Sequence, residues 1–208
     1  YVLGWRCAPV DGDEGFDELE TLYSALVLGL RDYVNKNGFP GVLVGLSGGV
    51  DSALTVAIAA DALGADRVRS VMMPSRYTSQ ESLDDAIACA DALGINHDSI
   101  AIEPMVASFD NALAPQFEGL AADTTEENIQ ARIRGELLMA MSNKLGHMVV
   151  ATGNKSEMSV GYSTLYGDLC GGFAILKDVY KTKAYELCHW RNANVPQQIG
   201  RASCRERV

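Results

Sequence analysis

Residues 41–52 read GVLVGLSGGVDS and join a short apolar run to a glycine-rich turn and then to a helical pattern. The run 41–46 is apolar and partly β-branched, which is typical of a strand buried on both faces of a sheet. Apolar residues at helical spacing follow at once, from Ala53 to Leu63. A buried strand that leads directly into a helix predicts a βαβ unit and therefore a parallel sheet.

The same alternation continues on both sides of this segment. An apolar stripe from Leu19 to Val34 predicts an amphipathic helix that Asn37 and Gly38 close. Later in the chain we expect strands at 68–73, 100–103 and 147–152, and helices ending at Leu93, spanning 126–145 and spanning 182–193. Because helices separate the strands, the crossovers are right-handed, and the predicted fold class is α/β, a three-layer sandwich with a central parallel sheet.

Two capping-box patterns mark the expected starts of helices. Thr78 with Glu81, and Thr124 with Glu127, have the spacing at which two side chains satisfy the free backbone N–H groups of a helix start. We therefore expect helices to begin just after Thr78 and Thr124.

Composition and charge exclude several classes of protein. Of the 208 residues, 48% are hydrophobic and 21% are charged, as in ordinary globular proteins and unlike disordered or collagen-like chains. The net charge of −10 opposes attraction to phosphate backbones, so we expect no nucleic-acid partner. No apolar run reaches the roughly 18 residues of a membrane-spanning helix. Five scattered cysteines without a CxxC pattern favour a reducing, cytoplasmic location.

The two ends of the chain differ from its middle. Residues 1–16 are rich in glycine and acidic residues, and we interpret them as a linker from a missing upstream domain. Residues 17–196 are expected to form one domain, truncated at its C-terminus, and residues 197–208, with three arginines, an atypical tail. The glycine-rich stretch 153–172 is too long for an ordinary connection, so we expect it to be functional.

The turn at 45–52 has the composition of a phosphate-binding loop. Small residues let a ligand approach the backbone, and the N-terminus of the following helix favours negative charge. No lysine follows the second glycine, so the turn is not the phosphate loop of kinases and GTPases. Asp51 stands where a carboxylate would hold Mg²⁺ beside phosphates. The plain alternatives are a glycine turn that only packs well, and an acid that stabilises the helix dipole.

The SGG-x-DS pattern resembles the PP-loop of ATP pyrophosphatases, in which attack falls on the α-phosphate and pyrophosphate leaves. Further segments resemble the synthetase domain of the glutamine-dependent NAD⁺ synthetase family: TEENIQARIRG at 125–135, ATGNKSEMS at 151–159, YGD at 166–168 and KDVYKT at 177–182. The resemblance covers about residues 21–192. It implies a fold similar to the adenine nucleotide alpha-hydrolases, which is Rossmann-like.

This resemblance implies a reaction and its partners. The implied reaction is the ATP-dependent amidation of deamido-NAD⁺ to NAD⁺ by ammonia, through an adenylated intermediate, with Mg²⁺ and with release of AMP and pyrophosphate. The resemblance also implies that a missing nitrilase-like domain supplies the ammonia from glutamine. It further implies a homodimer or higher homo-oligomer, with the dinucleotide site near a subunit interface.

The family motifs imply roles for individual residues. Asp51 and Glu157 are the implied catalytic residues and share Mg²⁺. Asn128, Arg132 and Glu157 are implied to hold deamido-NAD⁺. The residues implied to bind ATP are Gly45, Leu46, Ser47, Gly48, Gly49, Val50, Asp51, Ser52, Thr152 and Lys181.

Position along the chain supports several of these roles. Asp51 follows the first expected strand and Glu157 follows the fourth, so both lie at carboxyl ends of parallel strands, where α/β folds bind ligands. Asn128 and Arg132 are four residues apart on one helix face, so both can point into one crevice.

Plainer interpretations stay open for the same residues. Arg132 could pair with Glu127 or Glu136 on a solvated helix face, Glu157 could be a surface acid, and Lys181 a solvated lysine at a helix start. At the level of function, the alternatives are another PP-loop amidotransferase, such as a GMP synthetase, and a non-catalytic nucleotide-binding module.

Overall fold

The computed structural model describes residues 17–195, so the expected linker 1–16 and tail 197–208 lie outside the described residues. The described chain contains a five-stranded sheet in the order β3-β2-β1-β4-β5, and every neighbouring pair is parallel. The strands are β1 (Val42–Gly45), β2 (Val68–Met72), β3 (Asn96–Ser99), β4 (Met148–Ala151) and β5 (Phe173–Ala174). The predicted α/β fold with a central parallel sheet is confirmed.

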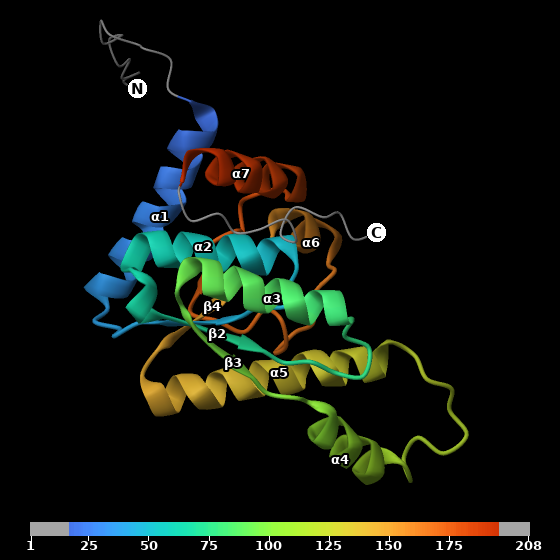
Figure 1. Cartoon of the computed structure of the whole chain (residues 1–208). Coiled ribbons are helices and arrows are strands. Elements are labelled where there is room, and N and C mark those ends of the chain that lie inside the picture. The colour runs from blue at the N-terminus through green and yellow to red at the C-terminus, as the bar shows by residue number, and fades with distance from the viewer. Residues whose placement is uncertain (1–16, 196–208) are drawn as a thin grey trace, which may run out of the picture.

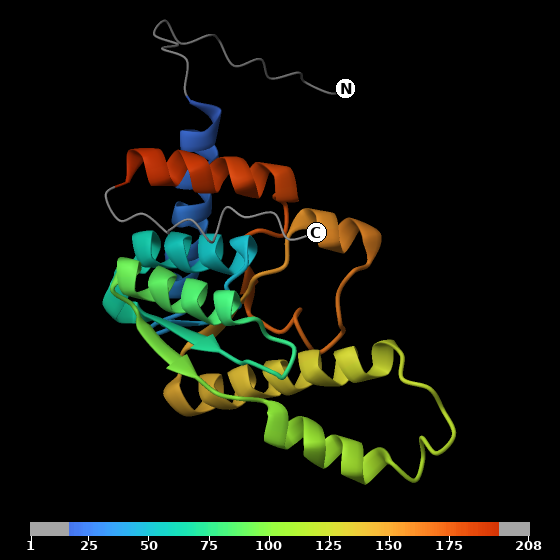
Figure 2. The ribbon, with the colours of Figure 1, turned by 45° about the vertical axis from the view of Figure 1, so that its right-hand side comes forward.

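Helices cover both faces of this sheet (Figure 1). One face carries α1 (Glu18–Lys36), α2 (Val50–Leu63), α3 (Gln80–Leu93) and α7 (Lys181–Asn194). The other face carries α5 (Thr124–Leu145), with α4 (Glu103–Leu113) packed beside it (Figure 2). A short 3₁₀ turn, η1 (Ala65–Arg67), precedes β2, and α6 (Lys155–Val160) follows β4. The three layers are the sandwich predicted from the alternation of strands and helices.

The side chains of β1 explain why the sheet needs two helical layers. Val42 and Val44 point into the core cluster under α2, whereas Leu43 between them points into the cluster under α5. All three are fully buried. A strand that is apolar on both faces is stable only when both faces are covered.

Helix α2 is buried on almost every side. It packs against the sheet and against α1, α3 and α7, and residues 52–59 are all buried. Its sequence is accordingly apolar around most of its circumference, as expected for a helix inside a core. The acidic residues of α2 are confined to its two ends, where Asp51 and Asp61 lie.

The order of the strands creates a crevice between β1 and β4. From β1 the chain moves outward to β2 and β3, and α5 then carries it back across the sheet to β4 on the other side of β1. The connections that leave the carboxyl ends of β1 and β4 therefore diverge. Such a switch point is where open α/β sheets bind their ligands.

Both predicted helix starts are wrong by one residue. The N-cap of α3 is Ser79, which accepts from Ser82 N, because the hydroxyl of Thr78 already accepts from Ser75 N within the preceding turn. The N-cap of α5 is Asp123, which forms a reciprocal capping box with Glu126. Aspartate is at least as good an N-cap as threonine, so the helix is capped by Asp123 and not by Thr124.

The prediction of a strand at 100–103 is also wrong. The strand β3 lies at 96–99, and Glu103 is already the first residue of α4, with Pro104 in its first turn. Residues 96–99 read NHDS and form an edge strand that is nowhere buried, so no apolar pattern marks it. The stretch 153–172 was expected to be a loop, but it begins with the helix α6 and leads into β5.

The apolar stripe of α1 packs within this chain. Tyr23, Leu30 and Val34 are buried in the cluster that α2 and α7 share. The stripe therefore contributes to the core, and the expected homodimer stays a prediction. Within residues 17–195, no helix has both the length and the apolar character needed to cross a membrane.

Candidate nucleotide site

The turn between β1 and α2 is fixed by its own side chains. The hydroxyl of Ser52 is buried, accepts from Ser47 N at 3.1 Å and donates to the carbonyl oxygen of Gly49 at 3.0 Å. Gly48 has a φ of +77°, and a Cβ there would lie 2.3 Å from the carbonyl oxygen of Ser82 on α3. No side chain caps the start of α2, so its first N–H groups are left for an anion.

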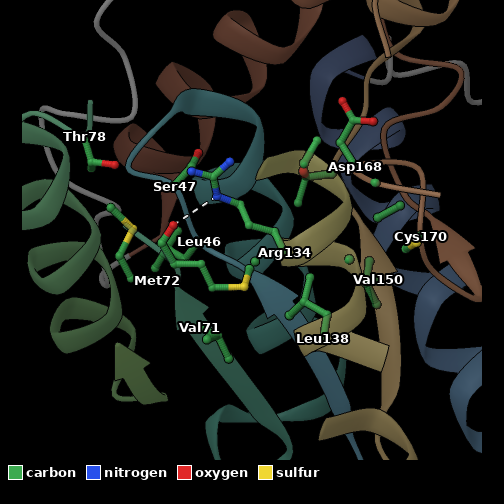
Figure 3. Close-up of a pocket in the computed structure, with 17 residues that line it drawn as sticks. Leu46, Ser47, Val71, Met72, Thr78, Arg134, Leu138, Val150, Asp168 and Cys170 are labelled. Carbon is green, nitrogen blue, oxygen red and sulfur yellow. Dashed lines mark hydrogen bonds between the residues drawn. The ribbon is translucent and has the colours of Figure 1, made fainter. Parts of the chain in front are cut away.

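A cavity of about 350 Å³ lies beyond this turn, between the carboxyl ends of β1, β2 and β4 and the helix α5 (Figure 3). Its wall combines apolar side chains with polar groups from Ser47, Thr78, Arg134, Thr152 and Asp168. Its lining residues are Gly45, Leu46, Ser47, Val71, Met72, Met73, Thr78, Ala131, Arg134, Gly135, Leu138, Val150, Ala151, Thr152, Gly167, Asp168 and Cys170. An apolar cleft with a few convergent polar groups is typical of a site for a flat organic ring.

Arg134 is the cationic group of this cavity. Its Nε donates to the carbonyl oxygen of Met73 at 3.0 Å (Figure 3), and burial lowers the pKa of its guanidinium. Among residues 17–195, no carboxylate forms an ion pair with it. Its remaining N–H groups are therefore available to a polar ligand in the cavity.

A second cavity of about 140 Å³ adjoins the first, and Ser47, Thr152 and Asp168 line both. It lies over the glycine turn and the start of α6. Its lining residues are Ser47, Gly49, Asp51, Ser52, Thr152, Gly153, Glu157, Met158, Tyr162, Ser163, Asp168 and Leu169. The structure therefore brings Asp51 and Glu157 to one cavity, as the strand positions predicted.

Asn154 joins the two carboxylates of the smaller cavity. Its side-chain oxygen accepts from Glu157 N at 3.1 Å, and its side-chain nitrogen donates to Asp51 Oδ1 at 3.2 Å. The backbone N–H of Asn154 donates to Glu157 Oε2 at 3.0 Å, which completes a capping box at the start of α6. Asn154 is fully buried and does not itself line the cavity, so it holds the two carboxylates from behind the wall.

The second oxygen of Asp51 pairs with Lys181, the first residue of α7. The backbone N–H of Lys181 is in turn bound by the hydroxyl of Ser156 on α6 at 3.1 Å. Lys181 is therefore not an isolated solvated lysine at a helix start, because its side chain meets the glycine turn through Asp51.

The donor set of the smaller cavity fits Mg²⁺. Burial raises the pKa of the Glu157 carboxyl, as does the nearby negative charge of Asp51. Within residues 17–195, no three His, Cys, Asp or Glu side chains lie close enough together to hold a metal ion by themselves. Mg²⁺ takes one or two carboxylates together with phosphate and water oxygens, so two carboxylates beside a phosphate loop are an adequate set.

Asn128 and Arg132 lie on a neighbouring face of α5 and line neither cavity. The side-chain oxygen of Asn128 accepts from Thr164 Oγ1 at 2.8 Å, and Arg132 Nε donates to the carbonyl oxygen of Leu165 at 3.2 Å. Both therefore hold the segment 163–170, which carries Asp168. Neither Glu127 nor Glu136 forms an ion pair with Arg132 within the described chain.

Sequence reasoning assigned no role to Arg134, Asn154 or Asp168. For Arg134 a signal was present, because Ala131, Arg134, Gly135 and Leu138 repeat at helical spacing and form the face of α5 toward the larger cavity. For Asn154 a signal was also present, because Asn154 and Glu157 have the spacing of a capping box. For Asp168, the chain gives no local pattern. Of the predicted loop residues, Gly48 and Val50 do not line either cavity, and Val50 is part of the core.

Comparison with known proteins agrees with this architecture. Residues 22–203 match the protein family described as NAD synthase. A glutamine-dependent NAD(+) synthetase of Rhodobacter capsulatus is 56% identical over 189 residues, which is 91% of this chain and 34% of that protein. The chain thus spans about a third of the length of the curated relatives that it matches.

Solved structures show the same fold. A glutamine-dependent NAD+ synthetase from Acinetobacter baumannii, in complex with ADP, superposes with a TM-score of 0.89 at 51% identity, over 96% of this chain and 37% of that one. An NH3-dependent NAD synthetase from Campylobacter jejuni gives a TM-score of 0.76 at 30% identity, over 85% of this chain and 74% of that one.

Replacing Gly48 should disable the glycine turn. In Gly48→Ala the added Cβ overlaps the backbone of Ser82 and the residue keeps an unfavourable φ, so we expect ATP binding to weaken by about tenfold or more and the melting temperature to fall. Gly29→Ala in α1 is the matched control, because its Cβ meets only Phe173 at 3.9 Å. An equal loss of ATP affinity in both variants would contradict the assignment of the glycine turn as an ATP-binding loop.

Asn154→Ser should separate the two roles of Asn154. Serine still caps α6 but does not supply the donor to Asp51, so we expect little loss of stability and about a tenfold weaker affinity for Mg²⁺-ATP, the size of one hydrogen bond to a charged group. Asp123→Ser at the N-cap of α5 is the control and should bind normally. Titration with Mg²⁺-ATP measures the affinity of both variants. An unchanged affinity in Asn154→Ser would show that Asp51 does not need the hydrogen bond from Asn154.

Proposed function

The chain belongs to the NAD synthase family, and we propose that it carries the site at which deamido-NAD⁺ is amidated to NAD⁺ at the expense of ATP. In the first step, a carboxylate oxygen of the nicotinate ring attacks the α-phosphorus of ATP, and pyrophosphate leaves. In the second step, ammonia attacks the carbonyl carbon of the acyl adenylate, a proton is lost, and AMP leaves. The first step is needed because a free carboxylate does not expel oxide when ammonia attacks.

The observation that carries this proposal is the pair of adjoining cavities at the carboxyl ends of β1 and β4. The larger cavity suits an adenosine group, since its wall combines apolar side chains with the polar groups of Arg134 and Thr78. The smaller one suits phosphates and a metal ion, since it combines the glycine turn with two carboxylates. The relative from Acinetobacter baumannii was solved with ADP, which supports nucleotide binding at such a site.

In this proposal the ATP phosphates lie on the turn 45–52. The uncapped start of α2 supplies N–H groups and favourable partial charge. Lys181 lies close enough to this turn to pair with Asp51, so its ammonium group is placed to contact phosphate oxygens. Thr152 lies at the boundary of the two cavities, where the sugar and the first phosphate would meet.

Asp51 and Glu157 would hold Mg²⁺ in the smaller cavity. Bound there, the ion would screen the charge of the pyrophosphate leaving group. Asn154 supports both carboxylates, one through its side-chain nitrogen and the other through the capping box, so they keep their positions before ligands arrive. This arrangement supports the proposal that a main contribution of the protein to catalysis is to hold the reacting groups in position.

The dinucleotide substrate is proposed to lie along the segment 163–170 and α5, held by Asn128, Arg132 and Glu157. Arg132 is exposed and keeps N–H groups beyond the one that binds Leu165, so it can contact an anionic group. Asp168 lines both cavities and therefore stands where the activated carboxyl group would meet ammonia.

Ammonia is proposed to come from glutamine, released by a domain outside this chain. The chain spans about a third of the length of the glutamine-dependent relatives, which supports this division. We retain the proposed homodimer or higher homo-oligomer. The described cysteines Cys89 and Cys170 form no disulfide, which supports the proposed cytoplasmic location.

The reaction products distinguish the proposed function from its rivals. With ATP, Mg²⁺, ammonium and deamido-NAD⁺, we expect the protein that carries this chain to form NAD⁺, AMP and pyrophosphate in equal amounts, because attack falls on the α-phosphorus. Formation of ADP, or binding of ATP without turnover, would contradict the proposal. Turnover of xanthylate in place of deamido-NAD⁺ would favour a GMP synthetase.

The metal assignment has its own test. Asp51→Asn and Glu157→Gln remove charge but keep volume, so the fold should persist while pyrophosphate release falls by at least about a hundredfold. Asp98→Asn, at the ion pair with Arg69 that joins β3 to β2 at the edge of the sheet, is a control that should leave the rate unchanged. If pyrophosphate release keeps its dependence on Mg²⁺ concentration in both site variants, these carboxylates do not hold the metal.

A further inference from the structure

Three side chains from three helices form a charged cluster away from the cavities. Arg191 of α7 is fully buried and forms two hydrogen bonds with Asp61 of α2, Nε to Oδ2 at 2.9 Å and a terminal nitrogen to Oδ1 at 2.8 Å. Tyr23 of α1 donates its hydroxyl to Asp61 Oδ2 at 2.5 Å and accepts from Arg191 Nε at 2.8 Å. We call these residues the Tyr23–Asp61–Arg191 cluster.

Stability alone does not account for such a cluster. Burying an ion pair costs desolvation, and well-packed apolar side chains of similar volume often stabilise a protein equally well or better. Burial also raises the pKa of the Tyr23 hydroxyl far above its usual range, so Tyr23 keeps its proton and acts as a fixed donor. What a cluster of this kind adds is a directional contact.

The cluster is the second of two ion pairs between the same helices. Asp51 and Asp61 lie ten residues apart on α2, Lys181 and Arg191 lie ten residues apart on α7, and each acid pairs with the corresponding base. The helices therefore run parallel with their starts side by side. Ten residues of helix rise about 15 Å, so a shift by one residue, about 1.5 Å, would break both pairs.

The apolar contacts of α7 do not define this register by themselves. Ala184, Leu187 and Cys188 pack into the core under α2, and the partly buried Tyr185 and Trp190 pack against the same core. Apolar contact of this kind is not directional. Arg191 forms a planar, two-point contact with Asp61 and fixes both the position and the rotation of α7.

We infer that the Tyr23–Asp61–Arg191 cluster positions Lys181 against the phosphate-binding turn. The cluster does not touch the ligand and acts through α7, so its three members are positioning residues. This inference rests on the proposed function, in which Lys181 contacts the phosphates of ATP. It adds that the register of α7, set about 15 Å away, controls how well that contact forms.

A double-mutant cycle between Arg191 and Lys181 tests the inference in the full-length protein. Arg191→Lys keeps the charge but loses the two-point contact, and we expect about a tenfold weaker affinity for Mg²⁺-ATP and about a tenfold lower kcat with ammonium. In a Lys181→Met background the same substitution should change neither quantity by more than about twofold, because the residue through which it acts is gone. An equal loss in both backgrounds would overturn the inference, as would no loss in the single variant.

A matched control and a second variant keep the test decisive. Arg69→Lys makes the same chemical change at the ion pair with Asp98 and should alter neither affinity nor kcat. If Arg191→Lys does not fold, the triple variant Tyr23→Phe, Asp61→Leu, Arg191→Met removes every polar member together and should keep its melting temperature. This triple variant should show the same tenfold losses of Mg²⁺-ATP affinity and of kcat, again only when Lys181 is present. Wild-type affinity in the triple variant would overturn the inference.

The two readouts separate this inference from the proposed function. Affinity for Mg²⁺-ATP is measured without deamido-NAD⁺, so the cycle on affinity decides the positioning role even if the substrate assignment fails. If the unaltered protein forms no NAD⁺ but the affinity cycle shows the expected dependence on Lys181, the proposed reaction is wrong and the positioning role stands.

Discussion

Parallel pairing between β1 and β4 is the interaction on which the site depends. It aligns Val42 with Met148 and Leu43 with Val149, so the segments that follow the two strands leave the sheet at the same edge. Asp51 and Asn154 are 103 positions apart in sequence, yet this pairing brings them within 3.2 Å of each other. The glycine turn and the pair of carboxylates follow from that alignment, because they lie in the segments just beyond these strands. The larger cavity needs the end of β2 and the helix α5 as well.

The sequence predicts the fold well because the central strands have no other way to be stable. Residues 42–44 and 148–150 are apolar on both faces, and only a sheet covered by helices on both sides buries them. The errors occur where local chemistry is ambiguous. The true N-caps Ser79 and Asp123 are each adjacent in sequence to the threonine that the capping-box pattern indicates. The strand β3 is a polar edge strand, so it has no apolar pattern by which to predict it. Short elements such as α6 and β5 depend on the sheet to which they attach.

The candidate site is predictable only as far as its residues follow a strand directly. Asp51 and Glu157 could be placed by that rule, and the structure brings both to one cavity. Asn154 depends on a tertiary hydrogen bond, and Asp168 on a loop whose course requires close approach to α5. A Cβ at Gly135 would lie 2.8 Å from the carbonyl oxygen of Tyr166, so this approach exists only because residue 135 has no side chain. Tertiary contacts of that kind produce no periodic pattern in a sequence.

The burial of α2 has a consequence for the exchange of its amide hydrogens with solvent. Residues 52–59 are enclosed by the sheet and three helices, so their N–H groups can exchange only when the whole domain unfolds. The glycine turn leads directly into that helix, and the buried hydroxyl of Ser52 holds it to the helix start. The connection from α4 to α5, by contrast, is exposed throughout 114–123 and is free to open locally on a far shorter timescale. Nucleotide phosphates are thus proposed to meet a slowly exchanging part of the molecule, while this exposed connection lies on the opposite helical layer.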